Sequence, residues 1–215
     1  MSLYVLTVPI GPFMQNCRFV YNKQSKEALL FDPGDEPNRL IREAQRLGLK
    51  IQAIFLTHGH LDHASAVDAM REYAQCDVYM HEKERPVYEY LKASAAVYGL
   101  NLPQPSPVDH YVKDNQEFSF LGTSFRALFT PGHTPGGVCY FFFKEEDPFI
   151  VVGDTLFNGS VGRTDLPGGN QNHLFQSIKT KLYTLPEDVV VMSGHGPDTT
   201  IGHEKRTNPF VTAYH

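Results

Sequence analysis

The segment Thr57-His58-Gly59-His60-Leu61-Asp62-His63 gathers four side chains that can bind a metal ion. An extended chain points alternate side chains the same way, so His58 and His60 would face one ion together. Asp62 and His63 diverge and need not bind the same ion as that pair. Imidazole nitrogen and carboxylate oxygen are ligands for zinc, and divalent iron or manganese can occupy similar sites. The segment therefore predicts a metal centre rather than a loop of surface histidines.

Three more candidate ligands each stand near the end of an apolar run, in glycine-rich sequence. His133 lies in Pro-Gly-His-Thr-Pro-Gly, Asp154 in Gly-Asp-Thr-Leu-Phe and His195 in Gly-His-Gly. Each of them alone would be an ordinary cap or turn residue. Loops at a common rim of a rigid scaffold can collect such side chains. Together with the four residues above they supply seven ligands, enough for two metal ions with open positions.

The elements around the first cluster must place it on a loop. Ile51 to Leu56 is a continuous apolar run that predicts a buried strand, and the residues after Asp62 predict a helix. Asp62 would also cap this helix at its N-terminus. The loop 57–61 then lies at the carboxyl end of a strand, which is a common ligand-binding position in α/β proteins.

The remaining pattern predicts a layered α/β domain with mixed strands. Helices are expected over 36–47, over 82–98 with Pro86 in the first turn, and over 173–182. The run Val138 to Phe143, with aromatic residues at 140–143, predicts a core strand, and the tail from His203 to Arg206 predicts a solvated surface. The other predicted strands cover residues 4–10, 17–21, 28–31, 78–80, 118–120, 124–129, 149–152 and 189–192.

The composition is that of a globular protein. A length of 215 residues favours one domain over 1–215, and 41% hydrophobic with 20% charged residues excludes a disordered or coiled-coil chain. The formal net charge of −5 provides no field to attract nucleic acid or anionic lipid. No apolar run approaches the roughly 20 residues that cross a bilayer. Three scattered cysteines and no leader sequence predict reduced thiols and a cytoplasmic location.

The ordered motifs resemble those of the metallo-β-lactamase superfamily. These motifs are HGHLDH, PGHTPG, GDTLF and GHG, and Gly-Arg-Thr-Asp at 162–165 narrows the resemblance to the glyoxalase II group. The resemblance implies a four-layer αββα sandwich of two mixed β-sheets flanked by helices. It assigns one metal to His58, His60 and His133, and the second to Asp62, His63 and His195. Asp154 would bridge the two metals, and Asp32 would support the metal loop without binding metal.

The implied activity is hydrolysis of an acyl bond, most plainly the thioester of an S-(2-hydroxyacyl)glutathione or a similar acyl-thiol. A bridging hydroxide held by two divalent metals, zinc before iron or manganese, would attack the carbonyl, and Asp62 would orient it. Arg163 would bind a substrate carboxylate, or would order its own loop through Asp165. Only 20 residues follow His195, so the chain resembles a short form without the family's C-terminal helical domain. The expected partner is a small-molecule substrate, with no nucleic acid or membrane, in a monomer or small homo-oligomer.

Other activities stay open at this point. A mononuclear-iron persulfide dioxygenase shares the Gly-Arg-Thr-Asp loop and needs only His58, His133 and Asp154. The second set, Asp62, His63 and His195, is intact and favours the hydrolase. A lactonase would use the same metals on another acyl bond. A non-enzymatic zinc module is disfavoured, because structural zinc sites are usually closed and rich in cysteine.

Overall fold

The computed structural model describes residues 3–212, and these fall into two compact units. The first unit contains residues 3–112 and 120–122, and the second contains residues 113–119 and 123–212. Each unit is built on its own mixed β-sheet with helices packed against it. The expectation that residues 1–215 act as one domain stays a prediction.

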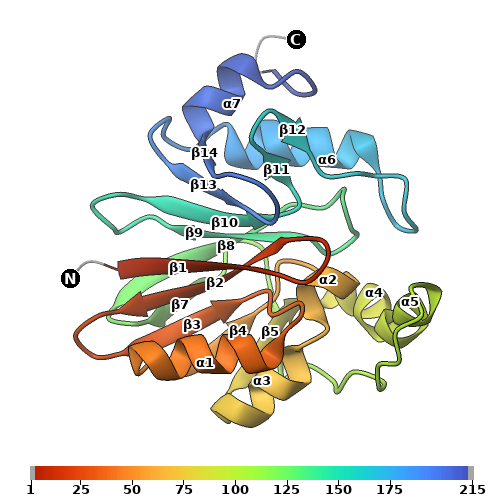
Figure 1. The fold of residues 1–215 in the computed structure, drawn as a ribbon. Coiled ribbons are helices and arrows are strands. Elements are labelled where there is room, and N and C mark those ends of the chain that lie inside the picture. The colour runs from red at the N-terminus through yellow and green to blue at the C-terminus, as the bar shows by residue number, and fades with distance from the viewer. Residues whose placement is uncertain (1–2, 213–215) are drawn as a thin grey trace. The chain divides into compact units, whose positions relative to one another are not determined.

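The sheet of the first unit has six strands in the order β1-β2-β3-β4-β5-β6 (Figure 1). The strands β1 to β3 pair antiparallel, and β3 to β6 continue in parallel. The run predicted as a buried strand is β4, at the centre of this sheet. The strand bounds are Leu3–Ile10, Gln15–Asn22, Glu27–Phe31, Lys50–Phe55, Asp77–His81 and His110–Val112.

Two helices bury their apolar stripes in a core shared with this sheet. Helix α1 (Pro37–Leu47) begins with proline and ends at Gly48, whose backbone has φ 67° and donates to the helix's last carbonyls. Leu40 and Ala44 of α1 are fully buried, beside Met70 of α3 (Val67–Ala74). The helix predicted over 36–47 is therefore confirmed, with the face that its spacing indicated.

The structure corrects three details of the first unit. The helix expected after Asp62 is two short pieces, α2 (Leu61–Ala64) and α3. The residue before the first piece is His60, and Asp62 lies inside its first turn, so Asp62 is not the N-cap. The helix expected over 82–98 is divided into the 3-10 turn η1 (Glu82–Glu84), α4 (Arg85–Glu89) and α5 (Leu91–Val97), and Pro86 starts α4 as predicted.

The second unit has a six-stranded sheet in the order β14-β13-β10-β9-β8-β7 and a separate hairpin, β11-β12. Helix α6 (Gln171–Ser177), the π-helical turn η2 (Ile178–Leu182) and helix α7 (Ile201–Thr207) pack against it through Leu174, Ile178 and Ile201. The strand bounds, from β7 to β14, are Glu117–Phe120, Thr123–Phe129, Val138–Phe142, Phe149–Gly153, Leu156–Phe157, Ser160–Val161, Val190–Ser193 and Thr199–Thr200.

In this unit the prediction of a core strand holds, whereas the prediction of a solvated surface at 203–206 fails at one residue. The core strand predicted at Val138 to Phe143 is confirmed as β9, which ends one residue earlier and buries Tyr140 and Phe142 fully. The solvated surface predicted at 203–206 is confirmed at His203 and Arg206, which are exposed on α7, but it is wrong at Glu204, which is completely buried. The carboxylate of Glu204 accepts hydrogen bonds from Gly159 N, Thr199 Oγ1 and Asn208 Nδ2 at 3.0, 2.7 and 2.8 Å. Burial of Glu204 is stabilised by these three donors.

The predicted fold class is confirmed, with two mixed sheets flanked by helices. The three cysteines are free thiols, as expected. Within residues 3–212, none of the helices has both the length and the apolar character needed to span a bilayer.

Candidate metal centre

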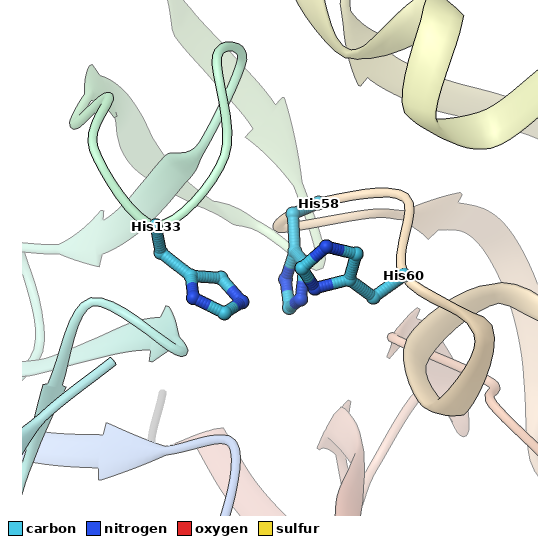
Figure 2. Close-up of side chains that lie close together, drawn as sticks. All are labelled: His58, His60 and His133. Atoms are coloured by element: carbon cyan, nitrogen blue, oxygen red, sulfur yellow. The ribbon is translucent and has the colours of Figure 1, made fainter. Parts of the chain in front are cut away.

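The first group of predicted ligands lies on the loop that follows β4. His58 and His63 are buried, and His60 and Asp62 are partly exposed. The rings of His58 and His60 meet edge to face with 4.8 Å between their centroids, and Figure 2 shows both side chains on this loop. The ring of His63 lies 4.0 Å from that of His58. Asp62 Oδ2 is 3.8 Å from His63 Nε2. All four predicted ligands of the first unit are therefore neighbours.

Asp32 holds this loop from the end of β3. Its Oδ1 accepts a hydrogen bond from Thr57 N at 2.7 Å, and its Oδ2 accepts one from Thr57 Oγ1 at 2.7 Å. The same Oδ2 lies 3.0 Å from His63 Nδ1. A carboxylate is an acceptor only, so this contact places the proton of His63 on Nδ1 and leaves Nε2 available to a metal. Asp32 thus has the supporting role that the resemblance implied.

Three further residues support the loop, and the sequence predicted none of these contacts. Glu84, in η1, is completely buried and accepts a hydrogen bond from Gly59 N at 3.0 Å. Thr57 Oγ1 lies 3.0 Å from His58 Nδ1, so the hydroxyl links this imidazole to Asp32. Gly34 also matters, because a Cβ at that position would overlap the carbonyl oxygen of Asp62. No local pattern marked Glu84, which follows the loop by more than twenty residues.

The second group of predicted ligands gathers in the other unit. Asp154 follows β10, and its Oδ2 lies 3.7 Å from His133 Nε2 and 3.6 Å from His195 Nε2. The loop of His133, drawn in Figure 2, joins β8 to β9, and His195 follows β13. Strands β9, β10 and β13 are consecutive neighbours in the sheet. The sheet order therefore brings together three residues that are widely separated in sequence.

The segment Gly162-Arg163-Thr164-Asp165 packs against His133. The carbonyl oxygen of Arg163 is 2.7 Å from His133 Nδ1, an arrangement in which Nδ1 donates and Nε2 is left for a metal. A Cβ at position 162 would overlap the carbonyl oxygen of Asp154. Glycine is therefore required where this segment passes between two predicted ligands.

The guanidinium of Arg163 contacts its own loop. Its Nε and Nη2 each donate to a carboxylate oxygen of Asp165 at 2.7 Å. This bidentate hydrogen bond lowers the pKa of Asp165 to about 2. The structure thus contains the loop-ordering contact that was the alternative to substrate binding. A role of Arg163 in binding a substrate carboxylate stays a prediction.

The donor set within the two units fits a divalent metal. It consists of five imidazoles and two carboxylates, with no cysteine among them. His58, His63 and His133 each have Nδ1 in contact with a protein oxygen, which fixes the ring and leaves Nε2 as the nitrogen that could bind a metal. Such nitrogen and oxygen donors suit zinc, iron and manganese. The chain therefore carries a candidate His/Asp metal site.

Comparison with known proteins agrees with this donor set. Residues 10–195 match the family model described as the metallo-beta-lactamase superfamily. The chain is 39% identical to the protein named "Probable metallo-hydrolase YqgX" of Bacillus subtilis, covering 96% of this chain and 97% of that protein. It is 38% identical to "Hydroxyacylglutathione hydrolase GloC" of Haemophilus influenzae, with the same coverage of both chains. The chain belongs to the metallo-β-lactamase superfamily and is related to metallo-hydrolases.

Solved structures show the same fold. The crystal structure of BLEG-1 B3 metallo-beta-lactamase has a TM-score of 0.90 and 41% identity, covering 97% of this chain and 100% of that one. The structure of TTHA1623 in a di-iron-bound form has a TM-score of 0.85 and 39% identity, covering 96% and 100%. ETHE1 from Myxococcus xanthus has a TM-score of 0.77 and 27% identity, covering 96% and 83%.

Proposed function

We propose that this protein hydrolyses the thioester of an S-(2-hydroxyacyl)glutathione or a similar acyl-thiol, releasing a hydroxy acid and a thiol. The relative named hydroxyacylglutathione hydrolase matches the chain over nearly its whole length, and this observation carries the proposal. The donor set supports it, because hydrolysis at a paired metal site needs no nucleophilic side chain.

The predicted ligands divide into two sets in this proposal. In this proposal His58, His60 and His133 would hold one divalent ion, as the resemblance of the motifs implies. Asp62, His63 and His195 would hold the second, and Asp154 would contribute to both. We take zinc as the first choice, with iron or manganese as alternatives, and a di-iron form of one similar structure supports iron. Such a pair lowers the pKa of water and polarises a carbonyl oxygen.

The side chains of this protein would then position the reactants. Asp62 is partly exposed beside buried His63, so its carboxylate can accept a hydrogen bond from the attacking water and orient it. Asp32 and Thr57 keep the imidazoles fixed while the substrate binds. Arg163 would bind a carboxylate of the substrate if it exchanged Asp165 for that group.

A persulfide dioxygenase that uses one iron is the second candidate. The similarity to ETHE1 and the shared Gly-Arg-Thr-Asp loop favour it. It would use His58, His133 and Asp154 and would not need Asp62. The two candidates therefore differ in metal stoichiometry, in oxygen consumption and in the effect of replacing Asp62.

The test combines metal analysis with parallel assays of the purified protein. The substrates are S-D-lactoylglutathione, a lactone, a cephalosporin and glutathione persulfide with oxygen. We expect two metals per chain and hydrolysis of the thioester, both strongly reduced in His60→Ala and Asp62→Ala. His173→Ala, which replaces an exposed histidine outside the donor set, is the matched control. One iron per chain with oxygen uptake, or activity on the lactone or cephalosporin alone, would refute the thioester proposal.

A further inference from the structure

A pocket of about 190 Å³ opens beside Asp62, entirely within the first unit. One side is the tip of the β1–β2 hairpin, from Ile10 to Phe13. The other side is the segment from Leu100 to Leu102, which follows α5. Leu61 and Asp62 of the metal loop also line it. The pocket thus joins an apolar lining to a predicted metal ligand.

The walls of this pocket are held by contacts outside it. Gly11 N donates to Glu36 Oε1 at 2.9 Å, and Arg39 Nη1 donates to Pro9 O at 2.9 Å. These bonds fix the hairpin tip to the start of α1. Phe13 and Tyr98 meet edge to face with ring centroids 5.6 Å apart, which connects the tip to the end of α5. The pocket is therefore a formed feature of the unit.

We propose that this pocket binds the apolar part of the acyl group of the substrate, an inference that rests on the proposed thioester hydrolysis. An apolar cavity of about 150 Å³ accepts a benzene molecule. The volume here therefore suits a phenyl ring or a short branched alkyl group better than the single methyl of a lactoyl group. The enzyme would prefer 2-hydroxyacyl thioesters with a bulky apolar group on C2.

The charged residues of the pocket indicate whether it binds the acyl end or the glutathione end of the substrate. The described residues that line it include no lysine or arginine, and Asp35 contributes a carboxylate that has no metal in our proposal. This carboxylate repels the anionic glutathione moiety, so that moiety would lie elsewhere. Phe13, which lines the pocket, is 45% exposed, so its ring presents apolar surface that a bound acyl group would cover. The pocket fits the neutral acyl end.

The kinetic test compares S-lactoylglutathione with S-mandeloylglutathione, which differ only in a methyl or phenyl group on C2. We expect kcat/KM to be about tenfold higher for the mandeloyl substrate, in line with the selectivity that apolar pockets achieve. Phe13→Ala removes one wall, and Leu102→Trp fills the space. Each should lower this preference about tenfold. Tyr90→Ala, which removes an exposed aromatic ring outside the lining, should retain the wild-type preference.

A binding measurement separates this inference from the proposed activity. Benzene has no atom that ligates a metal, so it reports only on the apolar pocket. Titrated into the zinc-loaded full chain, it should shift the methyl NMR signals of Leu61, Leu100 and Leu102, and Leu102→Trp should abolish the shifts. Shifts without hydrolysis of any thioester would refute the proposed activity and keep an apolar ligand pocket. Absence of these shifts, or equal hydrolysis of both thioesters by all variants, would overturn the pocket assignment.

Discussion

The substitution Asp32→Asn tests how the metal loop is held. Asparagine tolerates the positive φ of 50° at this position, so the backbone need not change. Its carbonyl oxygen can still accept from Thr57 N. Its amide nitrogen would replace Oδ2, which now faces both Thr57 Oγ1 and His63 Nδ1. The hydroxyl of Thr57 can rotate to accept a hydrogen bond from the new amide. The protonated Nδ1 of His63 cannot accept one, so two donors would face each other there.

The contact between these two donors determines how much stability and metal affinity the variant should lose. Hydrogen bonds to a charged acceptor contribute about 1.5–3 kcal/mol each, and the side chain of Asp32 is only 3% exposed, so water cannot replace them. With one bond weakened and one lost, we expect the free energy of unfolding to fall by about 2–4 kcal/mol. Moving the proton of His63 to Nε2 would remove the conflict between the two donors but would block the nitrogen that we propose binds the metal. Metal affinity should therefore fall about 10- to 100-fold.

Urea denaturation and competition with a chelator measure the two effects. Asp77→Asn is the matched control, because Asp77 also contacts a histidine, His110 at 2.9 Å, but on an exposed surface. Exposed pairs of this kind contribute at most about 1 kcal/mol, and this one is distant in sequence from the metal loop. If Asp32→Asn kept the stability and metal affinity of the wild type, the assignment of Asp32 as the support of His63 would be wrong.

Three further outcomes follow from buried contacts. Gly162→Ala should lower metal content several-fold in elemental analysis, because its Cβ would displace the carbonyl of Asp154; normal content would contradict this close packing. Glu204→Gln should lower the free energy of unfolding, measured in urea, by about 2–3 kcal/mol, because its carboxylate is buried. The control Glu187→Gln, at an exposed position, should change it by less than about 1 kcal/mol, and equal effects of the two variants would refute the role of burial. Burial, assisted by the charge of Asp77, raises the pKa of the Cys76 thiol to about 11. Its alkylation by iodoacetamide should therefore rise about tenfold per pH unit between pH 8 and 10, and a plateau below pH 9 would contradict the raised pKa.

The long elements could be predicted from the sequence, because their patterns are local. Leu40 and Ala44 repeat with the period of a helix, and Ile51 to Leu56 form a short apolar run of the length of a buried strand. The short strands β6, β11, β12 and β14 were missed, since two or three residues carry no period. The break between α4 and α5 also lacked a local signal. Tertiary packing decided these segments.

The sequence by itself was enough to name the candidate metal ligands, since HGHLDH, His133, Asp154 and His195 stand in recognisable motifs. Only the tertiary structure decided what supports them. Glu84 reaches Gly59, and Glu204 organises the end of the chain, through contacts between distant segments. The pocket beside Asp62 likewise joins a hairpin tip to residues 100–102. Spacing along the chain encodes which way neighbouring side chains point, whereas the partner of a buried polar group depends on which segments pack together.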